Sequence, residues 1–480
     1  MKTLNNTKRN GAFICSAVVA AFVCLSASVS ESYGQDVNSA YFIDNYTYSY
    51  RLNPAFTTKK SFIGGLLSNV NSGTNSNVGL STFFYPYEGQ LATFMHPAVD
   101  REEFLQKLKK KNRVNINISY NVASTGFWTK FKGKDIFQTF ELNMRNNSSS
   151  KVPYNLFSFL KPAGEEDFFY DLSHISAYTQ TYMEMASGTA LKFGNLEVGG
   201  RVKFLLGTNR INLKIMEMYA SLDGFQWALS SYAELAAAGG GVKRRLKHGS
   251  LGDYDIVNLA KIKYRPLGFG GIGGAIDLGV RYQVNDYINV SAAINDLGAI
   301  IWRNKVKGLN SGETFLVQVD DIQLDDIGSL GDVIEGIINK VESVYEFHPG
   351  KKSFSTQSLP LNFNVGAEFK MPFYKKMSIG ILGSFRDSHI NRYNELRMSL
   401  NAAPLKWLSL SLNTAITTYG WEVGGMVNVY AKKFSAFIGT DSYYYHMTPH
   451  LVPVNNFNTH VVLGVNYLLS RNPWVKNQKR

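Results

Sequence analysis

Apolar and polar side chains alternate with a period of two over most of this chain. The stretch 275–284, AIDLGVRYQV, is a clear example, because every second residue is apolar or aromatic and those between are small or polar. A segment with this period forms a β-strand with one apolar and one wet face. After Asn285-Asp286, a dipeptide typical of turns, the alternation restarts in YINVSAAIN, residues 287–295. The two segments predict an antiparallel hairpin.

The same pattern recurs throughout the sequence. Further alternating or strand-like segments are 113–120, 136–144, 177–185, 196–204, 361–370, 377–385, 408–416, 422–430, 434–443 and 460–467. We predict about 14 strands, in a range of roughly 12 to 18, because boundaries from a single sequence are imprecise. Aromatic clusters adjoin several of these segments, at 81–87, 167–170 and 442–446, and are expected to form interfacial girdles.

Strand length and inward charge favour a membrane barrel over a soluble sandwich. Sandwich strands usually have about 5 to 6 residues, whereas many segments here have about 9 to 12, enough to cross a bilayer at a tilt. Charged residues also stand in the wet faces, where a hydrated lumen would hold them. They are Glu197, Arg201, Lys203, Asp277, Arg281 and Glu368. We predict an all-β fold, a transmembrane antiparallel β-barrel in the cell outer membrane, with these residues lining the lumen for binding or selectivity.

The first residues have the order of a secretory signal peptide. Three basic residues precede the apolar run GAFICSAVVAAFVCL, 11–25, and small polar residues follow it. We predict cleavage after Gly34, since the run is short for a membrane anchor. Both cysteines of the chain lie in this leader, so the mature chain has none. An exported chain of this size without disulfides depends on a large hydrogen-bonded framework.

Four segments fall outside the alternating strands of the predicted barrel, 61–470. Residues 35–60 are expected to form a periplasmic segment or a plug, with Arg51, Asn53 and Pro54 of the RLNPAF motif as plug residues. Apolar residues at helical spacing predict helices near 96–112 and 327–347, placed either on loops or inside the barrel. Residues 471–480 form a basic tail.

Motifs of enzymes and cofactor sites are largely missing. The glycines at 268, 270 and 273 match G-x-G-x-x-G, but a dinucleotide site needs a helix after them, and a strand pattern follows instead. His446 and His450 are interrupted by Pro449, and the acidic run 320–326 lacks the glycine and final glutamate of a calcium loop. We therefore expect no enzymatic activity, no cofactor and no metal.

The formal charge is +13, and the densest basic runs are at 107–113 and 243–248. Because such runs are usually solvated loops, and no stripe of interleaved aromatics accompanies them, we expect contact with lipid headgroups and no nucleic-acid binding.

Several stretches resemble a family of outer-membrane barrels from Bacteroidetes that has no assigned function. They are YFIDNYTYSYRLNPAF (41–56), TFMHPAVDREEFLQKLKKKNRVNINISYN (93–121), AIDLGVRYQVNDYINVSAAINDLGAIIW (275–302) and PVNNFNTHVVLGVNY (453–467). More distantly, the chain is similar to long-chain fatty-acid transporter-like barrels and to barrels associated with type IX secretion and gliding. The resemblance implies a barrel over nearly the whole mature chain. It differs at the end, where a basic tail replaces a terminal aromatic residue.

Two functions remain open for such a barrel. One is a channel or transporter for a small or amphipathic solute, with the N-terminal segment as plug. The other is a non-conducting structural or accessory barrel of a surface-export or motility complex. The expected partners are outer-membrane lipid and lipopolysaccharide, the barrel assembly machinery and, for the second function, envelope secretion or motility proteins.

Overall fold

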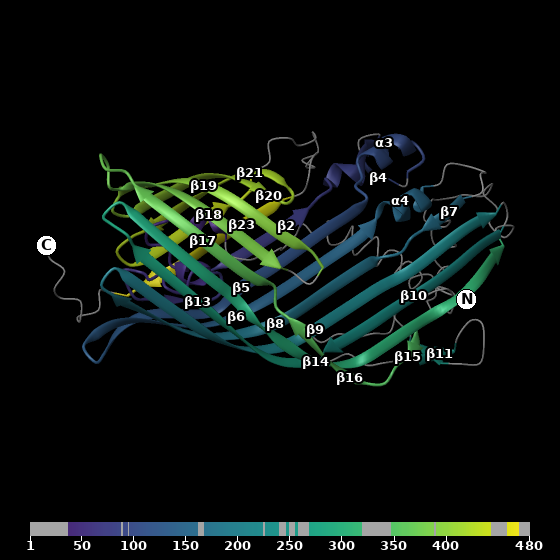
Figure 1. Cartoon of the computed structure of the whole chain (residues 1–480), viewed down its shortest axis with the longest axis horizontal. Helices are drawn as coiled ribbons and strands as arrows, with labels where there is room; N and C mark the ends of the chain where they lie inside the picture. The colour runs from purple at the N-terminus through teal and green to yellow at the C-terminus, as the bar shows by residue number, and fades with distance from the viewer. Residues whose placement is uncertain are drawn as a thin grey trace.

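The strands of this protein pair side by side into one closed antiparallel barrel of 14 strands (Figure 1). This confirms the predicted fold class. The computed structural model describes residues 37–87, 90–94, 96–161, 168–223, 226–239, 246–248, 255–257, 268–318, 347–387, 390–442 and 458–469. Outside these residues lie the predicted leader, the helix expected at 327–347 apart from Phe347, the tail 471–480, the acidic run 320–326, His446 and His450.

Several of the 14 wall positions are shared by collinear strands, because a loop interrupts the wall there. In order around the barrel the strands are β1 (Phe62–Gly64) with β2 (Val70–Ser76), β5 (Lys111–Phe131), β6 (Lys134–Pro153), β7 (Phe168–Asp171) with β8 (Ile175–Phe193), β9 (Leu196–Asp223), β10 (Gln226–Gly239) with β13 (Gly271–Gln283), β14 (Ile288–Gln318), β15 (His348–Pro349) with β16 (Ser353–Ser358) and β17 (Leu361–Lys370), β18 (Met377–Asp387), β19 (Arg392–Leu405), β20 (Leu408–Thr417), β21 (Gly420–Tyr430), β22 (Phe434–Thr440) and β23 (Thr459–Leu468). The barrel closes because β1 and β2 each pair with both β23 and β5.

Short elements complete the described chain. They are the 3-10 helices η1 (Asn38–Ala40) and η2 (Leu80–Thr82), the helices α2 (Ser49–Leu52), α3 (Arg101–Gln106) and α4 (Tyr154–Leu160), and the hairpin strands β3 (Phe84–Tyr87), β4 (Gln90–Thr93), β11 (Leu246–His248) and β12 (Asp255–Val257). In the described part of the chain, no helix is both long and apolar enough to cross a membrane.

The alternating sequence places apolar side chains outside the wall and polar ones inside. Leu278 and Leu412 are 50% and 64% exposed on the outer face, whereas Asp277 and Asn364 are fully buried on the inner face. This is the reverse of a soluble protein, and it suits a wall that has lipid outside and polar groups within. Where the strands close around the interior, each is paired with a neighbour on both sides, as the barrel closure through β1 and β2 requires.

The hairpin predicted at 275–295 is formed by β13 and β14. Asn285 organises its turn, since its Oδ1 accepts hydrogen bonds from the backbone N–H groups of Tyr287 and Ile288, both at 2.8 Å. β13 begins at Gly271 and pairs with β9 and β14 from that residue on. A strand therefore follows the glycine motif, which excludes the dinucleotide interpretation.

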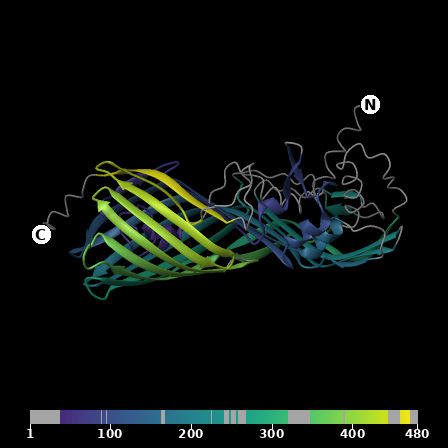
Figure 2. The ribbon, with the colours of Figure 1, turned by 90° about the horizontal axis from the view of Figure 1, so that it is seen from above.

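One side of the wall is much longer than the other. β9 has 28 residues and β14 has 31, whereas β17, β20 and β23 have 10 each. The lengths predicted from the sequence fit only the short side, since about 9–11 residues cross a bilayer. The long strands project at one end, which carries the longer connections and is called the loop end here (Figures 1 and 2). At the opposite, turn end, Lys132 and Gly133 have the positive φ angles of a tight hairpin turn.

A small apolar core lies at the loop end, where α3 and α4 pack against the long strands (Figure 1). The helix expected over 96–112 is shorter than predicted, Arg101–Gln106, and Asp100 caps it by accepting the N–H of Glu103 at 2.8 Å. Phe104 of this helix stacks on Phe94. Phe83 is buried in the same core, so the aromatic cluster 81–87 contributes here to a loop-end core and the girdle interpretation was wrong for it.

Candidate functional site

Residues 37–61 lie inside the barrel, in its turn-end half, and are called the interior segment here (Figures 1 and 2). Tyr46, Tyr48 and Asn53 of this segment are fully buried. The chain leaves the segment at the turn end, where Lys60 Nζ donates to the carbonyl oxygens of Ala431 at 3.1 Å and Lys432 at 2.9 Å. Directly after this contact the chain enters β1.

The interior segment is held to the wall through polar groups. Tyr48 OH donates to Asn466 Oδ1 at 2.8 Å, and the hydroxyls of Thr47 and Ser435 lie 2.6 Å apart. The carbonyl oxygen of Leu52 accepts from the side-chain amide of Asn295 at 3.0 Å. Inward polar side chains of several strands, Ser435, Asn466 and Asn295, therefore find hydrogen-bond partners on the segment, as buried polar groups usually do.

Two paired glycines of the wall make room for the Asn53-Pro54 dipeptide. Gly199 on β9 and Gly279 on β13 lie opposite each other in the sheet. A Cβ added at Gly199 would lie 2.0 Å from the Pro54 carbonyl oxygen, and one at Gly279 would lie 2.1 Å from Asn53 Oδ1. Only glycine allows the two backbones to approach this closely. The surfaces of the wall and the interior segment are thus complementary in shape at these two glycines.

Substituting Gly199 by valine is expected to displace the interior segment without breaking the wall, because β-branched residues suit strands. Gly200→Val is the matched control, since a Cβ at Gly200 meets nothing closer than 3.7 Å. The readout is maleimide labelling of Thr47→Cys, a fully buried position in a mature chain without native cysteine. We expect labelling to accelerate by at least about tenfold with Gly199→Val, which corresponds to 1.4 kcal/mol. Equal labelling rates in the two variants would contradict the close fit.

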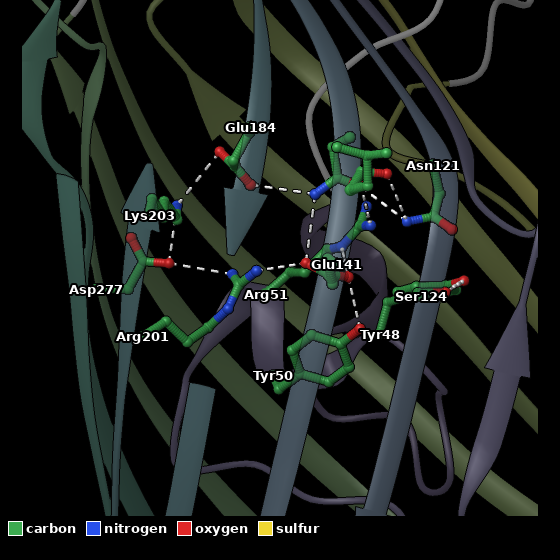
Figure 3. Close-up of polar contacts among 12 residues, drawn as sticks. Tyr48, Tyr50, Arg51, Asn121, Ser124, Glu141, Glu184, Arg201, Lys203 and Asp277 are labelled. Carbon is green, nitrogen blue, oxygen red and sulfur yellow. Dashed lines mark hydrogen bonds and ion pairs between the residues drawn. The ribbon is translucent and has the colours of Figure 1, made fainter. Parts of the chain in front are cut away.

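The centre of the lumen holds a network of buried charges that includes the segment (Figure 3). Arg51 Nε donates to Glu141 Oε1 at 2.8 Å, and its Nη2 donates to Asn143 Oδ1 at 2.8 Å. Arg201 contacts Glu141 on one side and Asp277 Oδ2, at 3.1 Å, on the other. Buried charges persist in proteins when they are paired in this way.

The network continues through strands β8 and β14. Lys203 Nζ lies 2.8 Å from Asp277 Oδ2 and 2.5 Å from Asp296 Oδ1. Arg145 reaches Asp296 at 3.0 Å and Glu184 at 3.3 Å. Five wall strands and α2 of the interior segment therefore share one electrostatic cluster.

A second charged cluster lies on the short side of the wall. Arg397 contacts Glu395 closely and lies 3.5 Å from Glu422 and 3.7 Å from Asp441. Asp441 Oδ2 also pairs with His460 Nδ1 at 2.9 Å.

The interior segment reaches this cluster too, because the backbone N–H groups of Asn38 and Ser39 donate to the Asp441 carboxylate at 2.8 and 2.7 Å.

Sequence reasoning named part of these clusters. Three of the six residues expected to line the lumen, Arg201, Lys203 and Asp277, come together in the central network. The other three lie nearer the turn end: Glu197 pairs with Lys192 at 3.0 Å and with Arg281 at 3.5 Å, and Glu368 accepts from Asn289 at 3.0 Å. The expected plug residues Arg51, Asn53 and Pro54 all contact the wall.

Several residues of the clusters were missed. They are Glu141, Arg145, Glu184, Asp296, Glu395, Arg397, Glu422, Asp441 and His460. Most of them stand at inward positions of β6, β8, β19 and β21, where the alternation was a usable signal, whereas Asp441 follows the end of β22. Within the described ranges, no group of three or more His, Cys, Asp and Glu side chains is arranged to hold a metal ion.

Comparison with solved structures gives distant likenesses. The toluene transporter TodX of Pseudomonas putida is 9% identical, with 92% of this chain and 99% of that chain covered and a TM-score of 0.36. The toluene transporter TbuX of Ralstonia pickettii is 9% identical over 92% and 96%, also with a TM-score of 0.36. The translocator domain of the autotransporter NalP of Neisseria meningitidis is 7% identical over 86% and 89%, with a TM-score of 0.31.

Sequence comparison gives a family. No protein of curated function matches the chain. The model of a family of unknown function, DUF5723, matches residues 54–441. This range contains most of the wall and both charged clusters apart from Arg51 and His460. The chain therefore belongs to the DUF5723 family of unknown function.

Proposed function

We propose that this protein is an outer-membrane barrel that passes a small or amphipathic solute, and that the interior segment closes its lumen in the state described. One observation carries the proposal: the segment is held by polar and charged groups of the wall, such as Glu141 and Asp441. Water can hydrate such a surface once the segment withdraws, whereas an apolar interior would collapse or stay dry. The pocket between segment and wall that includes Asp44, Arg281 and Glu368 is a starting point for that path.

The location in the outer membrane is part of this proposal. It is supported by the apolar outer face, with Leu278 and Leu412 among its exposed residues, and by the predicted leader peptide. Lipid, lipopolysaccharide and the barrel assembly machinery are the partners that such a location requires. We propose no catalytic activity and no resident cofactor.

Flux from proteoliposomes tests the proposal. The Gly199→Val variant, with its segment displaced, should release a small entrapped solute, while the Gly200→Val variant and the parent should release far less. If labelling at Thr47→Cys proves that the segment has moved and the Gly199→Val barrel still releases nothing, the passage function is wrong.

A second function is favoured by the long side of the wall. The projection of β9 and β14 beyond the short strands, with α3 and α4 packed on it, offers a platform at the loop end (Figure 2). We propose as the alternative a non-conducting structural or accessory barrel of a surface-export or motility complex. A silent Gly199→Val barrel that co-purifies with envelope proteins through this platform would favour the alternative.

A further inference from the structure

Hydrogen-bond donors of the interior segment converge on carboxylates of the wall. Glu141 Oε1 accepts from Tyr50 OH at 2.6 Å and from Arg51 Nε at 2.8 Å. Glu395 Oε2 accepts from the side-chain amide of Asn38 at 3.1 Å, and Asp441 accepts from backbone N–H groups. Withdrawal of the segment would therefore remove hydrogen-bond donors mainly from acidic groups, which would keep only their wall partners such as Arg201 and Arg397.

The central network also depends on the segment for its charge balance. Among the described residues it contains four carboxylates on the wall, of Glu141, Glu184, Asp277 and Asp296. The wall supplies three of the opposing cations, on Arg145, Arg201 and Lys203, and the segment supplies Arg51. Without Arg51 the wall carries one more negative than positive charge at this level. A buried carboxylate in such a site attracts another cation.

The place that Arg51 occupies has the chemistry of a cation site. Its guanidinium lies 2.8 Å from a carboxylate oxygen of Glu141, 2.8 Å from the amide oxygen of Asn143 and 4.5 Å from the centre of the Tyr48 ring. Charge-assisted hydrogen bonds and an aromatic face are the usual elements of guanidinium and ammonium recognition. Glu141 and Asn143 belong to the wall, so they stay when the segment leaves, whereas the Tyr48 ring leaves with the segment.

We propose that Glu141 and Asn143 form a cation-binding site of the lumen, which Arg51 fills as a resident ligand in the closed state. Building on the proposed passage function, we infer that the solute is cationic and carries a guanidinium or amino group that replaces Arg51. The solute and the interior segment then compete for one site. Binding of the solute would thus favour the open lumen, since a ligand shifts an equilibrium toward the state it binds better.

Guanidinium binding to the Arg51→Ala variant tests the site directly, independently of passage. In detergent, millimolar guanidinium chloride is expected to raise the thermal unfolding midpoint of this variant more than sodium chloride at equal ionic strength. The double variant Arg51→Ala/Glu141→Gln should lose this difference. If the double variant does not fold, Arg51→Ala/Asn143→Ala replaces it and should show a reduced difference. Equal effects of the two salts on Arg51→Ala would overturn the proposal.

Ion selectivity separates failure of the site from failure of the passage function. In planar bilayers under a potassium chloride gradient, the Gly199→Val/Arg51→Ala barrel, whose segment is displaced, should show a reversal potential toward that of potassium, and guanidinium should block its current. The half-blocking concentration should rise by about tenfold or more when Glu141→Gln is added to this barrel. An open barrel that prefers chloride, or is not blocked, would overturn the cation site and leave passage intact. A barrel that carries no current, but whose thermal unfolding midpoint still responds to guanidinium, would overturn the passage function and leave the cation site intact.

Discussion

Replacing Asp277 by alanine is expected to lower the free energy of unfolding by about 3–5 kcal/mol, because it leaves buried cations without their partner. Asp277 is fully buried, and its carboxylate lies 3.1 Å from Arg201 and 2.8 Å from Lys203. It also accepts the backbone N–H of Asp296 at 2.7 Å. The substitution thus removes one anion from between two cations. It also leaves the backbone N–H of Asp296 without this hydrogen-bond acceptor.

Urea unfolding in detergent micelles measures this effect. Asp286→Ala in the exposed turn after β13 is the matched control, and it should change the unfolding free energy by less than about 0.5 kcal/mol, as surface substitutions usually do. A loss below about 1 kcal/mol for Asp277→Ala would show that the network contributes little, since even a typical substitution costs about that much.

Replacing the next residue, Leu278, by arginine is expected to impair the barrel for a different reason. Leu278 is half exposed on the outer face, where an arginine at mid-membrane costs about 2–4 kcal/mol. Gln283→Arg on the same strand is the control, because Gln283 lies on the inner face near the turn end. Folding into lipid vesicles, followed by heat-modifiable gel migration, should show a large loss only for Leu278→Arg. Similar losses for both would contradict the assignment of the two faces.

The period of two was sufficient to predict the wall and one row of lumen residues. Asp277 and Arg201 were found because alternation holds without interruption on both sides of them, and the structure places them opposite each other in β13 and β9. Asp296, which donates its backbone N–H to Asp277, was not found. It lies at an irregularity between β13 and β14 and has a positive φ of 62°. A single extra residue there reverses the faces of the strand, which simple counting along the sequence does not detect.

The alternating pattern could not predict the lengths of the strands, for a physical reason. Alternation indicates a strand that has one face toward lipid. β9 and β14, however, continue far past the short side of the wall. At the loop end, residues such as Ile215 are covered by the apolar core around α3 and α4, so no simple two-sided pattern marks the strand. Phe83 was misread for the same reason, because an aromatic residue in a core and one at a membrane interface look alike in sequence.

The position of the interior segment followed from a different kind of signal. The RLNPAF motif was named as a plug because it lies near the N-terminus, ahead of the first strand of the predicted barrel. The glycines that accommodate it, Gly199 and Gly279, lie in other strands, and only the register of β9 with β13 brings them together. Tertiary pairing of this kind leaves no mark in the local sequence.

A disulfide between the segment and the wall tests most directly whether the interior segment closes the lumen. The hydroxyls of Thr47 and Ser435 are within hydrogen-bond distance at 2.6 Å, so sulfur atoms at both positions should reach the S–S bond length of about 2.05 Å after a small adjustment. The pair Ser148→Cys/Thr179→Cys, whose hydroxyls are 2.8 Å apart within the wall, is the control.

The measurement is the current through the Gly199→Val barrel carrying either cysteine pair, before and after reduction. The account predicts that the Thr47–Ser435 disulfide abolishes the current and that reduction restores it. The current through the barrel with the control disulfide should be the same before and after reduction. Current that persists through the barrel with its segment locked to the wall would contradict it.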